Sequence, residues 1–77
     1  MSITPAQCRG ARGLLGWSQS DLSKASRIAT KTVADFERGA RVPYPRTLDD
    51  IQGALEKAGI QFISKNGGGP GVRLRQP

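Results

Sequence analysis

The sequence predicts a mainly α fold, with four helices followed by a short C-terminal β-strand pair. Three observations lead to this fold class. Apolar residues recur at spacings of three and four in four segments, and residues that typically begin or end helices separate these segments. The last stretch alternates apolar with polar side chains, as strands do. We therefore expect a compact helical domain at residues 1–59 and a β extension at residues 60–77.

The first helix is expected to begin at Thr4-Pro5. A threonine hydroxyl accepts hydrogen bonds from free N–H groups at a helix start, and proline at the first helical position loses no hydrogen bond. Cys8, Ala11 and Leu15 then lie on one face. Gly16 supplies the left-handed residue that ends the helix.

The second helix is expected to begin after Ser18, which caps it together with Asp21 three residues later. Leu22 and Ala25 of this helix face inward. The helix is short, and the sequence Ile28-Ala29 separates it from the next one.

A third helix is expected to follow a cap at Thr30 and to end at Gly39. Val33 and Phe36 share its inner face. Two short helices separated by about four residues form the helix-turn-helix arrangement.

The fourth helix is expected from Thr47, because Pro43 and Pro45 prevent helix continuation through residues 40–46. Its apolar stripe is the most regular in the chain. The residues of this stripe and the glycine that follows it are Leu48, Ile51, Leu55, Ala58 and Gly59.

Two short strands are expected at residues 60–63 and 72–75, joined by a glycine-rich loop at residues 66–71. They either fold back on each other or pair with a second subunit, since an isolated two-stranded ribbon is marginal in water. Arg73 and Arg75 alternate with apolar residues, so that one strand face is basic. We expect the apolar face to be a dimerisation element, formed by Ile60, Phe62, Val72 and Leu74.

The chain is strongly basic. Its 77 residues carry 12 Lys and Arg against 6 Asp and Glu, which gives a net charge of +6 and a pI near 10.5. This balance favours a polyanionic partner, and double-stranded DNA is the partner that we expect.

Several function classes are excluded by composition. The chain has no histidine and one cysteine, Cys8, so the usual zinc sets and histidine-based triads cannot form. Asp49 and Asp50 are adjacent on a helix and point in different directions. We therefore expect no enzymatic activity, no cofactor, no metal and no small-molecule ligand. No leader and no run of eighteen apolar residues occur, so we expect a cytoplasmic protein without a membrane partner.

Three motifs stand at the expected helix boundaries. The chain reads L-G-x-S-Q-x-x-L over residues 15–22, E-x-G-x-x-x-P over residues 37–43 and T-L-x-x-I over residues 47–51. In these motifs, from about Thr4 to Gly59, the sequence resembles the phage-repressor type of helix-turn-helix family, named after lambda repressor and Cro. The resemblance implies a four-helix lambda-repressor-like DNA-binding domain.

The resemblance also implies a role for the third helix, which would enter the major groove. Thr30, Lys31 and Asp35 match family positions that contact bases, and Gln19 matches a glutamine that contacts phosphate. Lys31 can donate to guanine, and Asp35 can accept from cytosine. Two alternatives stay open: Thr30 is a cap rather than a reader, or Asp35 pairs with Lys31 or Arg38 rather than with a base.

Further basic side chains are expected to contact the DNA backbone, and the others are ordinary solvated charges, such as Lys24, Lys57 and Lys65. The expected backbone contacts are Arg9, Arg27, Arg38, Arg41 and Arg46. Arg27 departs from the family pattern, since it stands where the turn usually has glycine. A left-handed residue there costs roughly 1 kcal/mol when it is not glycine.

Arg12 and Glu37 match positions at which many family members form a partly buried ion pair, so we expect this pair to be structural. Trp17 is expected to pack against the second or fourth helix rather than to stack on a base. Tyr44 belongs either to the core or to a phosphate contact.

The function that follows is a sequence-specific DNA-binding transcriptional regulator, a bacterial or phage repressor that acts as a homodimer on a two-fold symmetric operator. The alternative is an antitoxin-like or anti-activator module that uses the same fold to bind a protein. The basic charge around the third helix favours the first reading, because protein binding alone would leave that surface unexplained.

Overall fold

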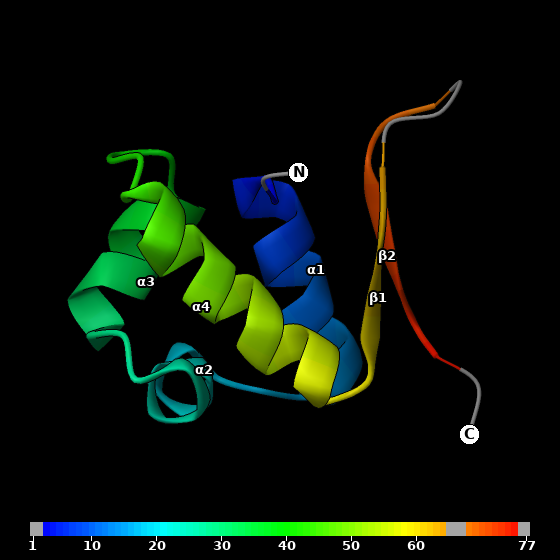
Figure 1. The fold of residues 1–77 in the computed structure, drawn as a ribbon, viewed down its shortest axis with the longest axis horizontal. Helices are drawn as coiled ribbons and strands as arrows, with labels where there is room; N and C mark the ends of the chain where they lie inside the picture. The colour runs from blue at the N-terminus through cyan, green and yellow to red at the C-terminus, as the bar shows by residue number, and fades with distance from the viewer. Residues whose placement is uncertain (1–2, 65–67, 76–77) are drawn as a thin grey trace.

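A computed structural model describes residues 3–64 and 68–75 of the chain. Four helices precede two strands, in the order α1 (Pro5–Leu15), α2 (Gln19–Ser26), α3 (Thr30–Glu37), α4 (Pro45–Lys57), β1 (Ile60–Ile63) and β2 (Gly71–Leu74) (Figure 1). The predicted fold class is confirmed. The second strand begins and ends one residue earlier than predicted.

The first two helices begin as predicted, with side-chain caps. The Thr4 hydroxyl accepts a hydrogen bond from the backbone N–H of Gln7 at 3.1 Å, and the Gln7 side chain accepts one from the Thr4 N–H at 2.9 Å. Ser18 and Asp21 form the same reciprocal pair at 3.0 and 2.9 Å. Each capping box satisfies N–H groups that the helix itself leaves free.

The last two helices begin differently from the prediction. Thr30 is the first residue of α3, and the cap position belongs to Ala29, which forms no side-chain cap hydrogen bond. The helix α4 begins at Pro45 instead of Thr47 and has no side-chain cap either. Pro45 starts this helix because its fixed φ suits the first helical position.

Left-handed residues close three of the turns. Gly16 and Gly39 have φ values of 69° and 75°, as predicted for residues that follow helix ends. Behind Gly39, the N–H of Ala40 donates to the carbonyl of Asp35 at 2.9 Å, which satisfies the C-terminus of α3. Arg27 ends α2 with φ of 61°, so the chain accepts the strain expected for a residue other than glycine.

A single core joins all six elements. Most of the predicted apolar residues are buried, whereas Leu15 and Ala58 are half-buried; Ile3 and Ile60 from outside the four helices add to the core. Ala25 is exposed, which corrects the inward position expected for it. The core comprises Ile3, Cys8, Ala11, Leu22, Val33, Phe36, Leu48, Ile51, Leu55 and Ile60.

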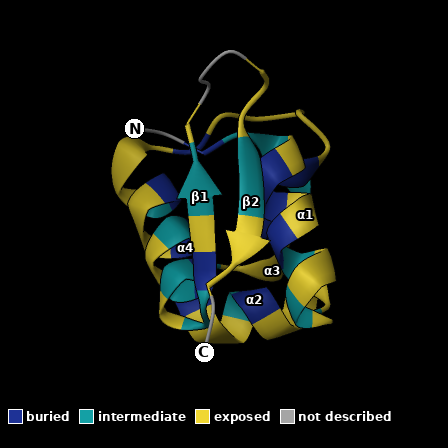
Figure 2. Ribbon diagram, turned by 90° about the vertical axis from the view of Figure 1, so that its right-hand side faces the viewer, coloured by how far each residue is buried: buried dark blue, intermediate teal, exposed yellow. Residues whose placement is uncertain are grey.

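The two strands form an antiparallel hairpin within the chain, which decides between the two pairings considered above. Ile60 pairs with Leu74 and Phe62 with Val72, so these four side chains share one face. This face lies on the helices, with β1 beside α4 and β2 beside α1 (Figure 2). A Cβ at Gly10 of α1 would come within 3.2 Å of a Val72 methyl group, so α1 and β2 approach closely.

The expected dimerisation face is therefore largely occupied by the chain's own core. Ile60 is 1% exposed, and Phe62 and Val72 pack partly buried against the core. Leu74 alone of the four is exposed. Ile60 is therefore not available to a second subunit, which corrects the prediction for that residue, and dimerisation through the other three stays a prediction.

Gln7 ties the hairpin to the first helix. Its side-chain Nε2 donates to the carbonyls of Ile63 at 3.3 Å and Gly71 at 3.0 Å, one on each strand. The Gln7 side chain is also part of the α1 capping box, so one buried residue holds a helix start and the loop end of the hairpin.

The elements place α3 and the hairpin at opposite ends of a molecule that measures 31 × 26 × 19 Å (Figure 1). Helices α1 and α4 lie between them. Because α1 and α4 separate α3 from the hairpin, the hairpin does not cover the surface of α3 that faces away from the core.

No helix within residues 3–64 and 68–75 has the length and apolar character needed to cross a membrane.

Candidate nucleic-acid interface

The outer face of α3 carries charged side chains. Val33 and Phe36 turn into the core, while Lys31, Asp35 and Arg38 follow at spacings of four and three on the other side. Thr30 is exposed at the first turn, and its side chain forms no cap hydrogen bond. The cap role considered for Thr30 is thus wrong, and its hydroxyl lies where an approaching molecule can reach it.

Asp35 lies between two cations of its own helix. One carboxylate oxygen accepts from Lys31 Nζ at 3.3 Å, and the other accepts from Arg38 Nη2 at 2.9 Å. The hydrogen bonds from Arg38 and then Lys31 lower the pKa of Asp35. Of the two roles considered for Asp35, contact with a base or pairing with the neighbouring cations, the structure shows the pairing.

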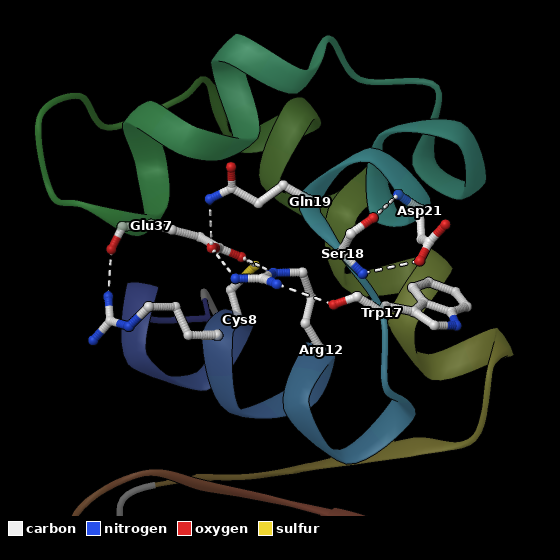
Figure 3. A network of polar contacts seen from close by, with 8 residues as sticks. Cys8, Arg12, Trp17, Ser18, Gln19, Asp21 and Glu37 are labelled. Atoms are coloured by element: carbon white, nitrogen blue, oxygen red, sulfur yellow. Dashed lines mark hydrogen bonds and ion pairs between the residues drawn. The ribbon is translucent and has the colours of Figure 1, made fainter.

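Glu37, the last residue of α3, is the centre of a polar network (Figure 3). Arg12 of α1 binds both carboxylate oxygens, with Nε and Nη2 at 2.7 and 2.6 Å. Gln19 of α2 donates to one of these oxygens at 3.0 Å, and the Cys8 thiol donates to the other at 3.1 Å. The predicted Arg12–Glu37 ion pair is present, and it joins α1 to α3.

Burial and pairing set the ionisation of this network. Burial by itself would raise the pKa of Glu37, but hydrogen bonds from Arg12, Gln19 and Cys8 outweigh it and lower that pKa. The hydrogen bond to Glu37 raises the pKa of Arg12, so the pair stays charged. Burial, followed by the Glu37 carboxylate, raises the pKa of Cys8, so its thiol stays protonated, as expected for a core residue.

The network also engages two residues that were expected at the DNA backbone. Gln19 donates to Glu37, and Arg9 Nη1 donates to the Glu37 backbone carbonyl at the end of α3. Arg12 additionally donates to the Trp17 carbonyl at 3.0 Å, which fixes the link between α1 and α2. Two helices, α1 and α2, therefore hold the C-terminal end of α3 from behind.

Exposed arginines border α3 on two sides. Arg27 lies in the turn before it, and Arg38, Arg41 and Arg46 follow it. A surface hollow lies beside Arg41, lined by Thr32, Arg41, Val42, Pro43, Tyr44 and Thr47. The starts of α3 and α4 lack side-chain caps, so their first N–H groups lie free of such partners in the same half of the molecule.

Two residues on α3 were not singled out from the sequence. Ala34 lies in a second hollow, lined by Arg9, Arg12, Gln19, Ala34, Glu37 and Arg38. Thr32 lies in the first hollow. Helical spacing places Ala34 one turn from Thr30 and Lys31, and this signal alone would have found it. Thr32 lies in a hollow only because the loop after α3 passes beside it, and the sequence does not predict the path of that loop.

The two aromatic residues near the motif differ in burial. Trp17 packs against the core, as expected. Tyr44 is 83% exposed, which excludes the core position considered for it. Among residues 3–64 and 68–75, no cluster of three or more His, Cys, Asp or Glu side chains lies where it could hold a metal.

Comparison with known proteins agrees with this geometry. The family profile described as helix-turn-helix matches residues 9–59, which is most of the chain and ends just before the hairpin. No curated protein matches the chain. Proteins of this family are DNA-binding transcription regulators, and the matched residues contain α2, α3, α4 and most of α1, including Arg12 and Glu37. The chain belongs to the lambda repressor and Cro type of helix-turn-helix family.

Proposed function

We propose that this protein is a sequence-specific repressor, and that two copies of it occupy a two-fold symmetric operator with α3 in the major groove. One observation carries the proposal: α3 is fixed from behind by the Glu37 network, while its outer face of Lys31, Asp35 and Arg38 stays open at one end of the molecule.

The size and chemistry of this face suit the major groove. That groove is about 12 Å wide and accepts an α-helix, and its base edges offer distinct sets of donors and acceptors. Lys31 can donate to guanine O6 and N7. Asp35 orients Lys31 and Arg38 in the free protein, and one of its oxygens can accept from a cytosine amino group when DNA replaces the Lys31 contact. Thr30 can donate to or accept from a base at the first turn.

The surroundings of α3 suit the phosphate backbone. Arg27, Arg38, Arg41 and Arg46 border the helix with exposed positive charge. The uncapped starts of α3 and α4 add backbone N–H groups and the positive ends of two helix dipoles, both of which favour phosphate oxygens. Arg9 and Gln19 contribute by keeping the network in place, and each can still reach phosphate with its remaining donors.

The hairpin has a different role in this proposal. It lies at the end of the molecule opposite to α3 and contributes Ile60 to the core. Residues 1–59 thus form the DNA-binding part, and Ile60, Phe62 and Val72 of the hairpin complete its core. Repression follows from occupancy, because a protein bound across a promoter excludes the polymerase.

The proposal is tested by selecting bound duplexes from a random DNA pool and then measuring affinity against salt. We expect enrichment of a two-fold symmetric motif. The logarithm of the binding constant should fall linearly with the logarithm of salt concentration, with a slope of about −0.9 for each phosphate contacted. Enrichment of no motif, with a shallow slope, would instead favour the protein-interaction module described above.

A further inference from the structure

We propose that the outer edge of β2 binds an extended segment of another protein, in which acidic and apolar side chains alternate. The segment adds a third strand to the hairpin. The surface that receives it, here called the β2 edge, consists of the backbone groups of Val72 and Leu74 that point away from β1, together with the side chains of Leu14, Arg73 and Arg75. The inference goes beyond the proposed function, because the β2 edge lies at the end of the molecule opposite to α3 (Figure 1).

The outer edge of β2 presents backbone groups that β1 does not use. Residues that face each other in an antiparallel pair alternate between exchanging hydrogen bonds and exchanging none. The N–H of Arg75 donates to the carbonyl of Gly59 at 2.8 Å, so in this register Arg73 is also bonded to β1. The N–H and C=O groups of Val72 and Leu74 therefore point away from β1, where they can pair with a further strand.

Helix α1 runs alongside β2 in the same direction. The Gln7 side chain donates to the carbonyl of Gly71, and further along α1 a Cβ at Gly10 would come within 3.2 Å of a methyl group of Val72. The hairpin forms a layer on one side of the helices (Figure 1), and α1 lies next to β2 (Figure 2), so a strand added at this edge rests on α1. Gly10 and Gly13 of α1 are exposed and carry no side chain, which leaves room for it.

Two exposed apolar side chains come next along the contact between α1 and β2. Leu14 follows Gly10 by four residues of helix, and Leu74 follows Val72 by two residues of strand, which are advances of about 6 Å and about 7 Å. Leu14 and Leu74 are each 45% exposed. Because they lie on the side of the sheet that meets the helices, apolar side chains of an added strand can cover both.

The opposite side of the β2 edge is cationic. Arg73 donates to the Gln61 side chain at 2.9 Å, and Arg75 donates to the backbone carbonyl of Glu56 at 2.7 Å. Within residues 3–64 and 68–75, neither arginine forms an ion pair with a carboxylate. The sequence from residue 57 to residue 77 contains four Lys and Arg and no Asp or Glu. Acidic side chains of an added strand therefore supply the charge that this edge lacks.

A second copy of the chain fits the β2 edge less well than an acidic segment does. In the symmetric pairing, Val72 of each copy bonds to Leu74 of the other, and the two Arg73 side chains lie directly opposite each other. Like charges in this position destabilise a sheet. A duplex would engage the arginines but leave Leu14 and Leu74 in water. A strand that alternates acidic and apolar residues satisfies both sides of the edge.

The test uses the full chain without DNA and two short synthetic peptides with blocked ends. Valine alternates with glutamate in one peptide and with lysine in the other. We expect roughly tenfold tighter binding of the glutamate peptide, measured by fluorescence anisotropy of labelled peptide. Amide hydrogen exchange followed by NMR should show that this peptide slows exchange at Val72 and Leu74. Exchange at Arg73 should not change, because its N–H is already bonded to β1.

Two variants separate the charged side of the β2 edge from its apolar side. Arg73→Glu should reverse the preference between the peptides, and Leu14→Ser should weaken binding of both several-fold. The matched control is Lys24→Glu, which makes the same change in net charge on an exposed residue of α2 and should keep the preference for glutamate. Thermal unfolding followed by circular dichroism checks that each variant folds.

Three outcomes would overturn the inference. Equal affinity of the wild type for the two peptides would remove the charge preference. Slower exchange at Val72 and Leu74 when the protein alone is concentrated would assign the edge to a second copy. Displacement of the peptide by a duplex of arbitrary sequence, lost in Arg73→Glu, would make this face a DNA contact. None of these measurements uses a selected operator, so they leave the proposed function to its own test.

Discussion

The four helices begin in two different ways. Helices α1 and α2 start with complete capping boxes, at Thr4 with Gln7 and at Ser18 with Asp21. Helices α3 and α4 start at residues whose neighbours provide no side-chain cap. The first pair is stabilised locally at its N-termini, whereas α3 is held at its other end, where Glu37 meets Arg12, Gln19 and Cys8.

This difference shows where stability and binding are separated in the molecule. A capped start has its N–H groups satisfied within the chain, so it contributes to folding and offers little to a ligand. An uncapped start keeps these groups for an anion. The starts of α3 and α4 lie in the half of the molecule that we propose to face DNA, and the predictions below test whether the contrast holds.

The largest effect is expected from Glu37→Ala. This change leaves the Arg12 guanidinium without its partner in a mostly buried position and removes the link among three helices, so it should cost about 3 kcal/mol of unfolding free energy. Urea unfolding followed by tryptophan fluorescence measures the loss. An effect below about 1 kcal/mol would mean that the network does not hold α3.

Acid should weaken the same link without removing any atoms. The pKa of Glu37 is lower in the folded chain than its ordinary value of 4.5. The stabilisation is therefore fully present above the unfolded pKa and is lost as pH falls through the folded pKa. We expect the urea midpoint to stay level down to about pH 5.5 and to fall below about pH 4.5.

The matched variant for the acid experiment is Glu37→Gln, which should show a shallower acid slope than the wild type. Asp21 and Asp35 also have lowered pKa values, through Ser18 and Arg38 respectively, so some slope should remain. An unchanged slope in Glu37→Gln would assign the acid sensitivity to the other carboxylates.

Lys31→Ala should cost about 2 kcal/mol of binding to the selected duplex and should relax base preference at one position. Arg41→Ala should weaken binding to all sequences alike and reduce the salt slope by about 1. Fluorescence anisotropy with matched and mismatched duplexes separates the two patterns. Uniform losses from both variants would contradict the placement of α3 in the major groove.

Cap substitutions test the contrast between helix starts directly. Thr4→Ala and Ser18→Ala should each lower the unfolding free energy by about 1 kcal/mol, because each removes a cap hydrogen bond. Thr30→Ala should leave stability unchanged or slightly raised, since alanine has the higher helix propensity and no cap is lost. A loss at Thr30 equal to the other two would show that it caps α3 after all.

The smallest effect is expected at the turn between α2 and α3. Arg27→Gly should relieve the left-handed strain and raise stability by about 0.5 kcal/mol, after the greater flexibility of glycine in the unfolded chain offsets part of the gain. Binding to all duplexes should weaken slightly because one cation is lost. Measuring the unfolding free energy and the DNA affinity on one preparation shows whether Arg27 improves binding at the expense of stability.

Much of the fold was predictable because its signals are local. Thr4-Pro5, Ser18 with Asp21, and the glycines at positions 16 and 39 each act through neighbouring backbone groups, and each has the predicted effect. The apolar spacing also identified the buried faces of α3 and α4. The prediction that Thr30 caps α3 was wrong, because Thr30 lies one position after the cap and is the first residue of the helix.

The candidate site was predictable only in part. The resemblance indicated Arg12 with Glu37, and the structure contains this pair. The contact between Arg9 and the end of α3 was missed, because it joins residues 28 positions apart through a backbone carbonyl that carries no sequence signal. The sequence did not decide whether Asp35 pairs with Lys31, with Arg38 or with neither, and in the structure it pairs with both.

The sequence by itself determined the fold class, the charge, the family and the approximate helix boundaries, because these depend on composition and on interactions between residues a few positions apart. Only the tertiary structure decided which way the hairpin faces and which apolar residues stay in water. Strand alternation defines two faces without saying which one meets the helices. That choice depends on the apolar surface that α1 and α4 present together to the strands, which exists only after the helices have packed.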